Sequence, residues 1–481
     1  MILVSNRQSY SHKETENGII CKKSVGGLVS ALDPLIHDRG GLWVAWGSGD
    51  ADFKVCNKEN EVLVPENDPS YMIKRIKLSD EEVENYYRGF ANRVLWPLFH
   101  LFIEKMHWKQ KYWDTYQSVN KKFADTIVDV MNKDGRDDHL IWIHDYHLSL
   151  APYYIKNRKP NAKIAFFWHI PWPPWEVFGS LPARDEIIQG LLSCELLGFH
   201  TKPYVQNFLQ SADKKRNTRV YTYEEGNFVE YDNHKTKIQS FPLGISYKDY
   251  AGEAKKPDIA KKAEKLKDRH QAEKLILGID RLDYTKGILY RLKAYESFLE
   301  NNPDATKEEA TLVQIATPSR YEIEEYSNMK KEIDETVGRI NARFRTEEWT
   351  PVKYFFRRIP QELLLAYYRA ADVGLLTPIR DGMNLISKEF IASNQKNGML
   401  ILSEFAGASE ELKEALIVNP YDIKETANAI KKAIEMPRSE RKQRCKKLKE
   451  KVKKYDSTWW VNSFFKEWKQ LYDQTTIKTT A

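Results

Sequence analysis

The chain has 481 residues, more than one ordinary hydrophobic core holds, so we expect two domains. Hydrophobic residues make up 42% of it, which is typical of globular proteins and excludes a disordered chain. The net charge of +7 suits small anionic substrates, and no recognised nucleic-acid-binding motif accompanies it.

The four cysteines are scattered and show no Cys-x-x-Cys spacing, so neither a zinc site nor a disulfide framework is predicted. The N-terminal residues lack the apolar core of a signal peptide, and no apolar run is long enough to span a bilayer. We therefore expect a cytoplasmic protein with reduced thiols.

The first predicted strand is Ile2-Leu3-Val4, which ends at Ser5-Asn6-Arg7 and leads into a polar loop. The loop closes at Ser24-Val25-Gly26-Gly27-Leu28, where a helix begins. Its paired glycines leave room for a phosphate or a sugar edge, although an ordinary glycine turn has the same pattern.

A second strand is predicted at residues 41–47, with the rings of Trp43 and Trp46 on one face. Trp46 stands beside the glycine turn and is the better candidate to face a ligand. Asp50-Ala51-Asp52 matches a short metal-binding pattern, but no strand follows it, so we expect it to be solvated.

Two later apolar strands end in polar residues. Residues 140–143 lead into His144-Asp145-Tyr146-His147, and residues 164–167 lead into Trp168-His169. Ligands of doubly wound folds bind at the carboxyl ends of strands, which makes both ends candidate sites. A zinc site would need a further ligand at recognisable spacing, and none is evident.

The second half of the chain alternates strands and helices, which predicts a parallel sheet with helices on both faces. A polar loop-and-hairpin insertion over residues 213–234 precedes it. The Lys/Glu-rich stretch 251–273 and the basic stretch 438–454 are predicted to be exposed helices. The strands are predicted at residues 275–279, 311–316, 352–356, 373–376, 400–402 and 416–418.

Two loops of this half carry the chemistry. In Arg281-Leu282-Asp283-Tyr284-Thr285-Lys286-Gly287, two cations on a strand-to-helix turn can neutralise a diphosphate leaving group without a metal. A solvated loop with a salt bridge to Asp283 is the alternative.

The other loop is Arg380-Asp381-Gly382-Met383-Asn384-Leu385-Ile386-Ser387-Lys388-Glu389, a strand end, a tight turn and a helix N-terminus. Gly382 allows the backbone close to a ligand, and the free N–H groups suit a phosphate. Glu389 is placed to accept hydrogen bonds from ribose hydroxyls; an exposed glutamate on a capped helix is the alternative.

Together these two motifs resemble those of the trehalose-6-phosphate synthase family of retaining glycosyltransferases, and the likeness extends over nearly the whole chain. The resemblance implies the GT-B fold: two doubly wound, Rossmann-like α/β domains that face an interdomain cleft. It predicts an acceptor domain over residues 1–245, a nucleotide-sugar domain over 246–456 and, over 457–481, a helix that crosses back to the first domain.

The resemblance also assigns roles to residues. It implies donor binding by Gly26, Gly27, Arg281, Lys286, Asp381, Gly382, Met383, Asn384, Leu385 and Glu389. It implies acceptor-phosphate binding by Arg7, Tyr87, Trp96 and Arg320, and acceptor-sugar binding by Trp46 and Asp145. It implies catalysis by Asp145, His169, Arg281, Lys286 and Asp381.

The implied reaction transfers glucose from UDP-glucose, or another nucleotide glucose, to glucose 6-phosphate and yields α,α-trehalose 6-phosphate with retention. No cofactor or metal is expected. A homo-oligomer is possible, and a separate trehalose-6-phosphate phosphatase is expected downstream. A glucosylglycerol-phosphate synthase that uses glycerol 3-phosphate is one alternative, because residues 150–163 also resemble those proteins. A non-catalytic sugar-phosphate sensor is the other.

Overall fold

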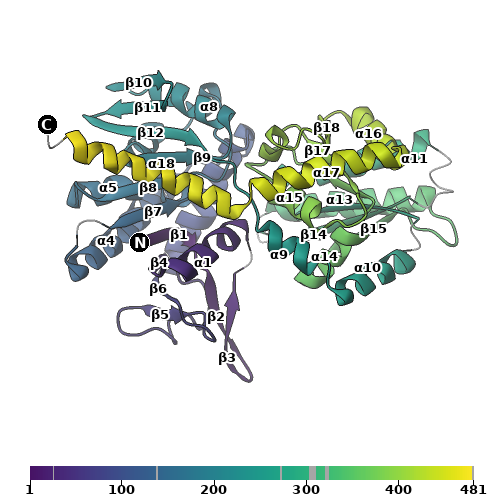
Figure 1. The fold of residues 1–481 in the computed structure, drawn as a ribbon, viewed down its shortest axis with the longest axis horizontal. Helices are drawn as coiled ribbons and strands as arrows, with labels where there is room; N and C mark the ends of the chain where they lie inside the picture. The colour runs from purple at the N-terminus through teal and green to yellow at the C-terminus, as the bar shows by residue number, and fades with distance from the viewer. Residues whose placement is uncertain (25, 137–138, 271–272, 303–309, 320–323, 479–481) are drawn as a thin grey trace. The chain divides into compact units, whose positions relative to one another are not determined.

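The computed structural model describes residues 1–24, 26–136, 139–270, 273–302, 310–319 and 324–478, and it divides into two compact units (Figure 1). Unit 1 comprises Met1–Pro242 and Trp460–Ala481, and unit 2 comprises Leu243–Trp459. The first division follows residue 242 where the sequence placed it after 245, and the second follows residue 459 instead of 456.

Unit 1 is built on a ten-stranded sheet in the order β10-β11-β12-β9-β8-β7-β1-β4-β6-β5. Strands β12 through β6 in this order pair in parallel, and the hairpin partners β10, β11 and β5 are antiparallel. The central strands β1, β7, β8 and β9 are largely buried, as expected for parallel strands with helices on both faces. The bounds are β1 Ile2–Arg7, β4 Leu42–Trp46, β5 Glu61–Val64, β6 Tyr71–Ile76, β7 Leu140–His144, β8 Lys163–Phe167, β9 Leu196–Phe199, β10 Thr218–Tyr223, β11 Gly226–Tyr231 and β12 His234–Ser240.

The helices of unit 1 include one that arrives from the far end of the chain. In α18, Trp460 stacks on Trp142 of β7 at 5.3 Å between ring centroids, and Glu467 pairs with Lys237 of β12 at 2.7 Å. The bounds are α1 Gly27–Arg39, α2 Asp80–Glu82, η1 Val83–Leu95, α3 Trp96–Phe99, η2 Ile103–Lys105, α4 Gln110–Asp134, η3 Tyr146–Leu148, α5 Ala151–Arg158, α6 Trp175–Phe178, α7 Arg184–Leu191, α8 Lys202–Asp213 and α18 Ser457–Lys478.

The polar loop predicted after Arg7 is instead a two-stranded antiparallel ribbon, β2 Tyr10–Thr15 with β3 Gly18–Lys23, which projects from the sheet of unit 1 (Figure 1). Tyr10 and His12 are buried, while the residues between and after them are half-buried or exposed. This alternation of buried and exposed residues marks a strand. The prediction of a loop failed because the buried residues Tyr10 and His12 are aromatic or polar, so they do not form the aliphatic pattern that usually marks a strand.

Unit 2 is a six-stranded, fully parallel sheet in the order β15-β14-β13-β16-β17-β18. All six predicted strands are confirmed. Their bounds are β13 Lys274–Arg281, β14 Ala310–Thr317, β15 Val352–Phe356, β16 Val373–Leu376, β17 Met399–Ser403 and β18 Leu416–Val418.

The helices of unit 2 form two packing groups, one with α11, α13 and α16 and the other with α9, α10, α14, α15 and α17. The predicted surface helices correspond to α10 and α17. None of the helices that the structure describes is both long and apolar enough to cross a membrane. The bounds are α9 Tyr247–Glu253, α10 Pro257–His270, η4 Tyr284–Lys286, α11 Ile288–Asn301, α13 Glu324–Phe344, α14 Gln361–Ala370, α15 Leu385–Ser393, η5 Gly407–Glu410, α16 Ile423–Glu435 and α17 Arg438–Lys454.

Each sheet contains the strand order 3-2-1-4-5-6 of a doubly wound domain. In unit 2 the order reverses between β13 and β16, and in unit 1 it reverses between β1 and β7. Ligands of such sheets bind outside the carboxyl ends of the strands at this switch point. The loops after β13 and β16 in unit 2, and those after β1 and β7 in unit 1, are therefore the candidate ligand-binding loops.

Candidate active site

The switch point of unit 2 brings the two sequence motifs together. The loop after β13 holds the loop after β16 by backbone hydrogen bonds, because Ile379 N and Arg380 N both donate to Thr285 O, at 2.8 and 3.2 Å. Gly287, at φ 65°, lies so close that a Cβ there would stand 2.6 Å from Thr377 O. The two motifs thus form one rigid loop pair.

A salt bridge between Lys286 and Asp381 joins the two loops. Lys286 Nζ donates to Asp381 Oδ2 at 2.5 Å, and Asn384 Nδ2 donates to the same oxygen at 3.1 Å. The side chains of Lys286 and Asp381 are only 10% and 16% exposed. Arg281 lies half-buried at the end of β13. The ammonium is therefore fixed in a position where a ligand anion could share it with the carboxylate.

The N-terminus of α15 follows directly. Asn384 caps it in the left-handed region, at φ 72°, and its side-chain oxygen accepts from Ser387 N at 3.0 Å. This cap leaves the amides of Leu385 and Ile386, which have no partner inside the helix, available to a ligand. Just before the cap, Gly382 and Met383 are buried. The predicted anion site at a helix start is thus present as a local structure.

Glu389 lies half-buried one turn further along α15. Its carboxylate accepts from Tyr368 Oη at 2.9 Å. Burial raises the pKa of Glu389, and hydrogen bonds from Tyr368 and Tyr250 oppose that rise. Sequence reasoning missed both tyrosines, because they belong to α14 and α9 and no motif joins them to Glu389.

The switch point of unit 1 holds Arg7 and Asp145. Arg7 is exposed at the end of β1. Asp145, directly after β7, has φ 75° and ψ 160°, a region that only glycine normally occupies, and its side chain accepts from Tyr146 N at 2.9 Å. Strain of about 1–3 kcal/mol persists only where the surrounding structure enforces it, and it concentrates at ligand sites.

Aromatic rings gather beside Asp145. Tyr87 lies 5.5 Å from Trp46 and stacks on His147 at 5.9 Å, and His147 Nδ1 stands 3.8 Å from Asp145 Oδ2. The prediction that Trp43 and Trp46 share a face is wrong. Trp43 is fully buried against Tyr71, whereas Trp46 is half-buried, because residues three apart on a strand point to opposite faces.

Tyr87 belongs to η1, a π-helix that continues directly into α3 at Trp96. Such wide turns are rare and are frequent at functional sites. Trp96 is 6% exposed and packs its ring 4.1 Å from that of His100. No sequence pattern that we used distinguishes a π-helix from an α-helix, so this feature was not predicted.

The other predicted site residues that the structure describes are Gly26, Gly27 and His169. Gly26 and Gly27 are half-buried at the start of α1, and a Cβ on Gly26 would have open space around it, with no atom of the described residues beyond its chain neighbours within 4 Å. His169 is half-buried after β8, and burial together with His200 and His144 lowers its pKa well below the usual range. Arg320 and Val25 lie outside the described residues.

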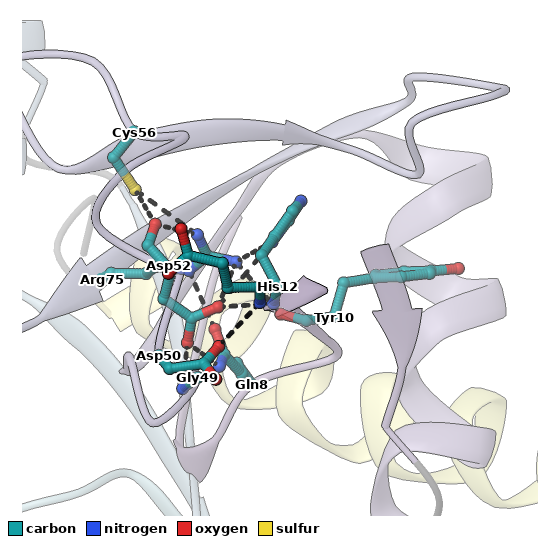
Figure 2. A network of polar contacts seen from close by, with 9 residues as sticks. Gln8, Tyr10, His12, Gly49, Asp50, Asp52, Cys56 and Arg75 are labelled. Atoms are coloured by element: carbon teal, nitrogen blue, oxygen red, sulfur yellow. Dashed lines mark hydrogen bonds and ion pairs between the residues drawn. The ribbon is translucent and has the colours of Figure 1, made fainter. Parts of the chain in front are cut away.

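The Asp50-Ala51-Asp52 stretch is solvated only at Asp50, and the prediction is wrong for Ala51 and Asp52. Asp52 is fully buried, pairs with Arg75 at 3.2 Å, and accepts hydrogen bonds from the Gln8 side chain and from His12 N (Figure 2). A buried carboxylate needs such partners to offset its desolvation. Its role is structural: it anchors ribbon β2–β3 to the sheet of unit 1.

Among the residues that the structure describes, no cluster of three or more His, Cys, Asp or Glu side chains is placed to hold a metal ion. The polar atoms at the two switch points are instead a carboxylate–ammonium pair, a strained carboxylate and helix-end amides. Such groups are suited to binding hydroxyls and phosphate oxygens.

Known proteins are similar to this chain in sequence and architecture. The model of glycosyltransferase family 20 matches residues 1–470. The UDP-forming alpha,alpha-trehalose-phosphate synthase of Candida albicans is 39% identical over 97% of this chain and 96% of its own.

Two solved structures also align over nearly their whole lengths. A Burkholderia xenovorans alpha,alpha-trehalose-phosphate synthase in complex with glucose-6-phosphate has a TM-score of 0.86 and 31% identity, covering 97% of this chain and 99% of that one. An E. coli structure bound with UDP-2-fluoro glucose has a TM-score of 0.86 and 34% identity, covering 98% of both. With its two Rossmann-like domains of the GT-B class, the chain belongs to glycosyltransferase family 20.

Proposed function

We propose that the protein is a retaining glucosyltransferase that transfers glucose from UDP-glucose to glucose 6-phosphate and forms α,α-trehalose 6-phosphate. The observation that carries the proposal is the loop pair of unit 2, where Lys286, Asp381 and the start of α15 meet at the sheet's switch point. The relatives' names and ligands, a UDP-sugar and glucose-6-phosphate, support the choice of substrates.

The donor binds to unit 2 in this proposal. Lys286, Arg281 and the first amides of α15 stabilise the negative charge that develops on the diphosphate as the anomeric C–O bond breaks. Asp381 accepts hydrogen bonds from glucose hydroxyls, and Glu389 accepts them from the ribose. Fixed cations supply the stabilisation that a metal ion supplies elsewhere, so we propose that no resident metal takes part.

The acceptor binds to unit 1. Arg7, with Tyr87, Trp96 and Arg320, binds the phosphate group, and Asp145 and Trp46 contact the sugar. The acceptor hydroxyl forms the new bond to the anomeric carbon on the face that the diphosphate leaves, and its proton passes to the departing phosphate oxygen. This course retains the configuration without a second catalytic carboxylate.

A product analysis tests the proposal. The protein is incubated with UDP-, ADP- or GDP-glucose and either glucose 6-phosphate or glycerol 3-phosphate, and the products are identified by NMR. We expect α,α-trehalose 6-phosphate with UDP-glucose and an unchanged rate in the presence of a chelator. Transfer to glycerol 3-phosphate alone would identify a glucosylglycerol-phosphate synthase, and binding without any product would identify a sensor.

The product is a phosphate monoester, so free trehalose requires a subsequent hydrolysis. We propose that a separate phosphatase carries out this step. A coupled assay with and without added phosphatase tests the point: inorganic phosphate released by this chain alone would contradict it.

A further inference from the structure

Three histidines lie at the carboxyl ends of three adjacent strands of unit 1. His144 ends β7, His169 follows β8 and His200 follows β9. His144 Nδ1 lies 3.1 Å from His169 Nε2, and the rings of His169 and His200 are 5.3 Å apart. His144 and His200 are buried, and His169 alone is half-exposed. His169 is therefore the member of this cluster that can reach a ligand.

The surroundings of His144 are apolar. Its ring lies 4.5 Å from that of Trp142 and 6.5 Å from that of Trp460. The second ring nitrogen of His144, Nε2, is buried and has no hydrogen-bond partner among the described residues. A proton on Nε2 would be a buried donor without an acceptor, which is rare in folded proteins and costly. The proton of neutral His144 therefore resides on Nδ1, which donates to His169 Nε2.

This donation determines the state of the second ring. A neutral imidazole carries one proton, and a nitrogen that accepts a hydrogen bond cannot carry it. Both rings are neutral, since burial lowers the pKa of His144 to about 3 and that of His169 well below 6.5. The proton of His169 is consequently on Nδ1.

We propose that His144 is a positioning residue that holds His169 in its Nδ1–H form, so that His169 presents a fixed, neutral N–H donor to a hydroxyl of the bound sugar. In the Nε2–H form, Nδ1 of His169 would instead present a lone pair, which would accept a hydrogen bond from the ligand and not donate one. The contact with a sugar rests on the proposed function, whereas the proton's position rests on unit 1 alone.

The proton's position is tested on the unliganded wild-type protein by long-range ¹H–¹⁵N correlation NMR at pH 7, with ¹⁵N-labelled histidine. A His169→Gln variant identifies the His169 signals. We expect a protonated Nδ1 and an unprotonated Nε2 for His169. A protonated Nε2 would overturn the proposal, and this readout requires neither activity nor a variant of His144.

The role of His144 is tested with a matched pair of variants. His144→Asn keeps a donor at the same position, because Asn Nδ2 and His Nδ1 are both bonded to Cγ, while His144→Leu fills similar space without a donor. We expect His144→Leu to mix the two forms of His169 and to lower kcat about tenfold, as the loss of one hydrogen bond predicts. KM for glucose 6-phosphate should stay unchanged, and His144→Asn should restore both the NMR pattern and most of kcat.

An unaltered NMR pattern in His144→Leu would overturn the proposal. A wild-type protein with the expected pattern but no transfer of any sugar would refute the proposed function and leave the proton's position established.

Discussion

Lys286 is the residue on which the proposed chemistry depends most directly. We expect Lys286→Ala to lower turnover by about 10²–10³, because a donor to the departing diphosphate is removed from a site in which it is already fixed by Asp381. Steady-state kinetics with UDP-glucose and glucose 6-phosphate measure the effect. Lys293→Ala, on the exposed face of α11, removes the same charge and should retain wild-type rates. Equal loss in both variants would contradict the assignment.

The second prediction concerns the effect of the backbone conformation at Asp145 on stability. Asp145→Gly and Asp145→Ala both remove the carboxylate, but only glycine adopts φ 75° and ψ 160° without steric strain. We expect the glycine variant to have the higher thermal midpoint, by about 2–4 °C for each kcal/mol of strain relieved. Both variants should lose transfer activity. A glycine variant less stable than the alanine variant would show that Asp145 is not strained.

How far these residues could be predicted depended on whether they lie in local motifs. Lys286 and Asp381 stand beside glycines in loops that follow apolar strands, a pattern that indicated a phosphate site, and the family resemblance assigned both residues to donor binding. Their mutual contact could not be predicted, because it depends on β13 and β16 being neighbours in the sheet. The tyrosines that hold Glu389 were not predicted for the same reason.

Among the elements, ribbon β2–β3 depends on a buried ion pair. Asp52→Asn removes the charge that faces Arg75, and we expect it to cost about 3–5 kcal/mol, since an unpaired buried guanidinium remains. Amides of the ribbon should also exchange with solvent faster. The matched control is Asp50→Asn, whose exposed side chain accepts from Glu14 N at 3.1 Å, and it should change stability by less than about 0.5 kcal/mol. Equal effects would contradict the anchoring role.

Three histidines of unit 1 determine how we expect its stability to depend on pH. The pKa values of His12, His144 and His169 are all lowered, chiefly by burial, so the unfolded chain binds protons below about pH 6.5 while the folded chain does not. Stability should therefore fall as the pH falls from about 6.5 towards 4. Each histidine contributes up to about 1.4 kcal/mol per pH unit.

Denaturant unfolding at several pH values measures this dependence. His144→Asn should reduce the slope by the share of one histidine, and an unchanged slope would show that His144 titrates normally in the folded protein.

The elements themselves were predicted unevenly for a physical reason. Every strand of unit 2 was found because parallel strands buried on both faces are continuous apolar runs. Strands β5, β6, β9 and β12 of unit 1 were not identified, and the ribbon β2–β3 was taken for a loop. The inward positions of β6 include Arg75, whose partner Asp52 lies in a separate loop, so no local pattern marks it as buried.

For the whole molecule, the last prediction concerns the packing of α18 against the sheet of unit 1. Trp460 is fully buried against Trp142 and Phe167, and we expect Trp460→Ala to cost about 3–5 kcal/mol. Hydrogen exchange should show the loss of protection in β7 and β8 and not in β13 and β14. The neighbouring Trp459 is half-buried and belongs to unit 2, so Trp459→Ala should leave β7 and β8 protected. Uniform loss of protection would contradict this division.

The same packing has a consequence for how the protein is made. Unit 2 is translated as one uninterrupted stretch, whereas the core of unit 1 stays incomplete until Trp460, which follows unit 2 in the chain, has been translated. Domains generally fold as units during synthesis. Unit 1, which contains the strained Asp145 and the paired histidines, is therefore expected to reach its native state after unit 2, although residues 1–242 are translated before it.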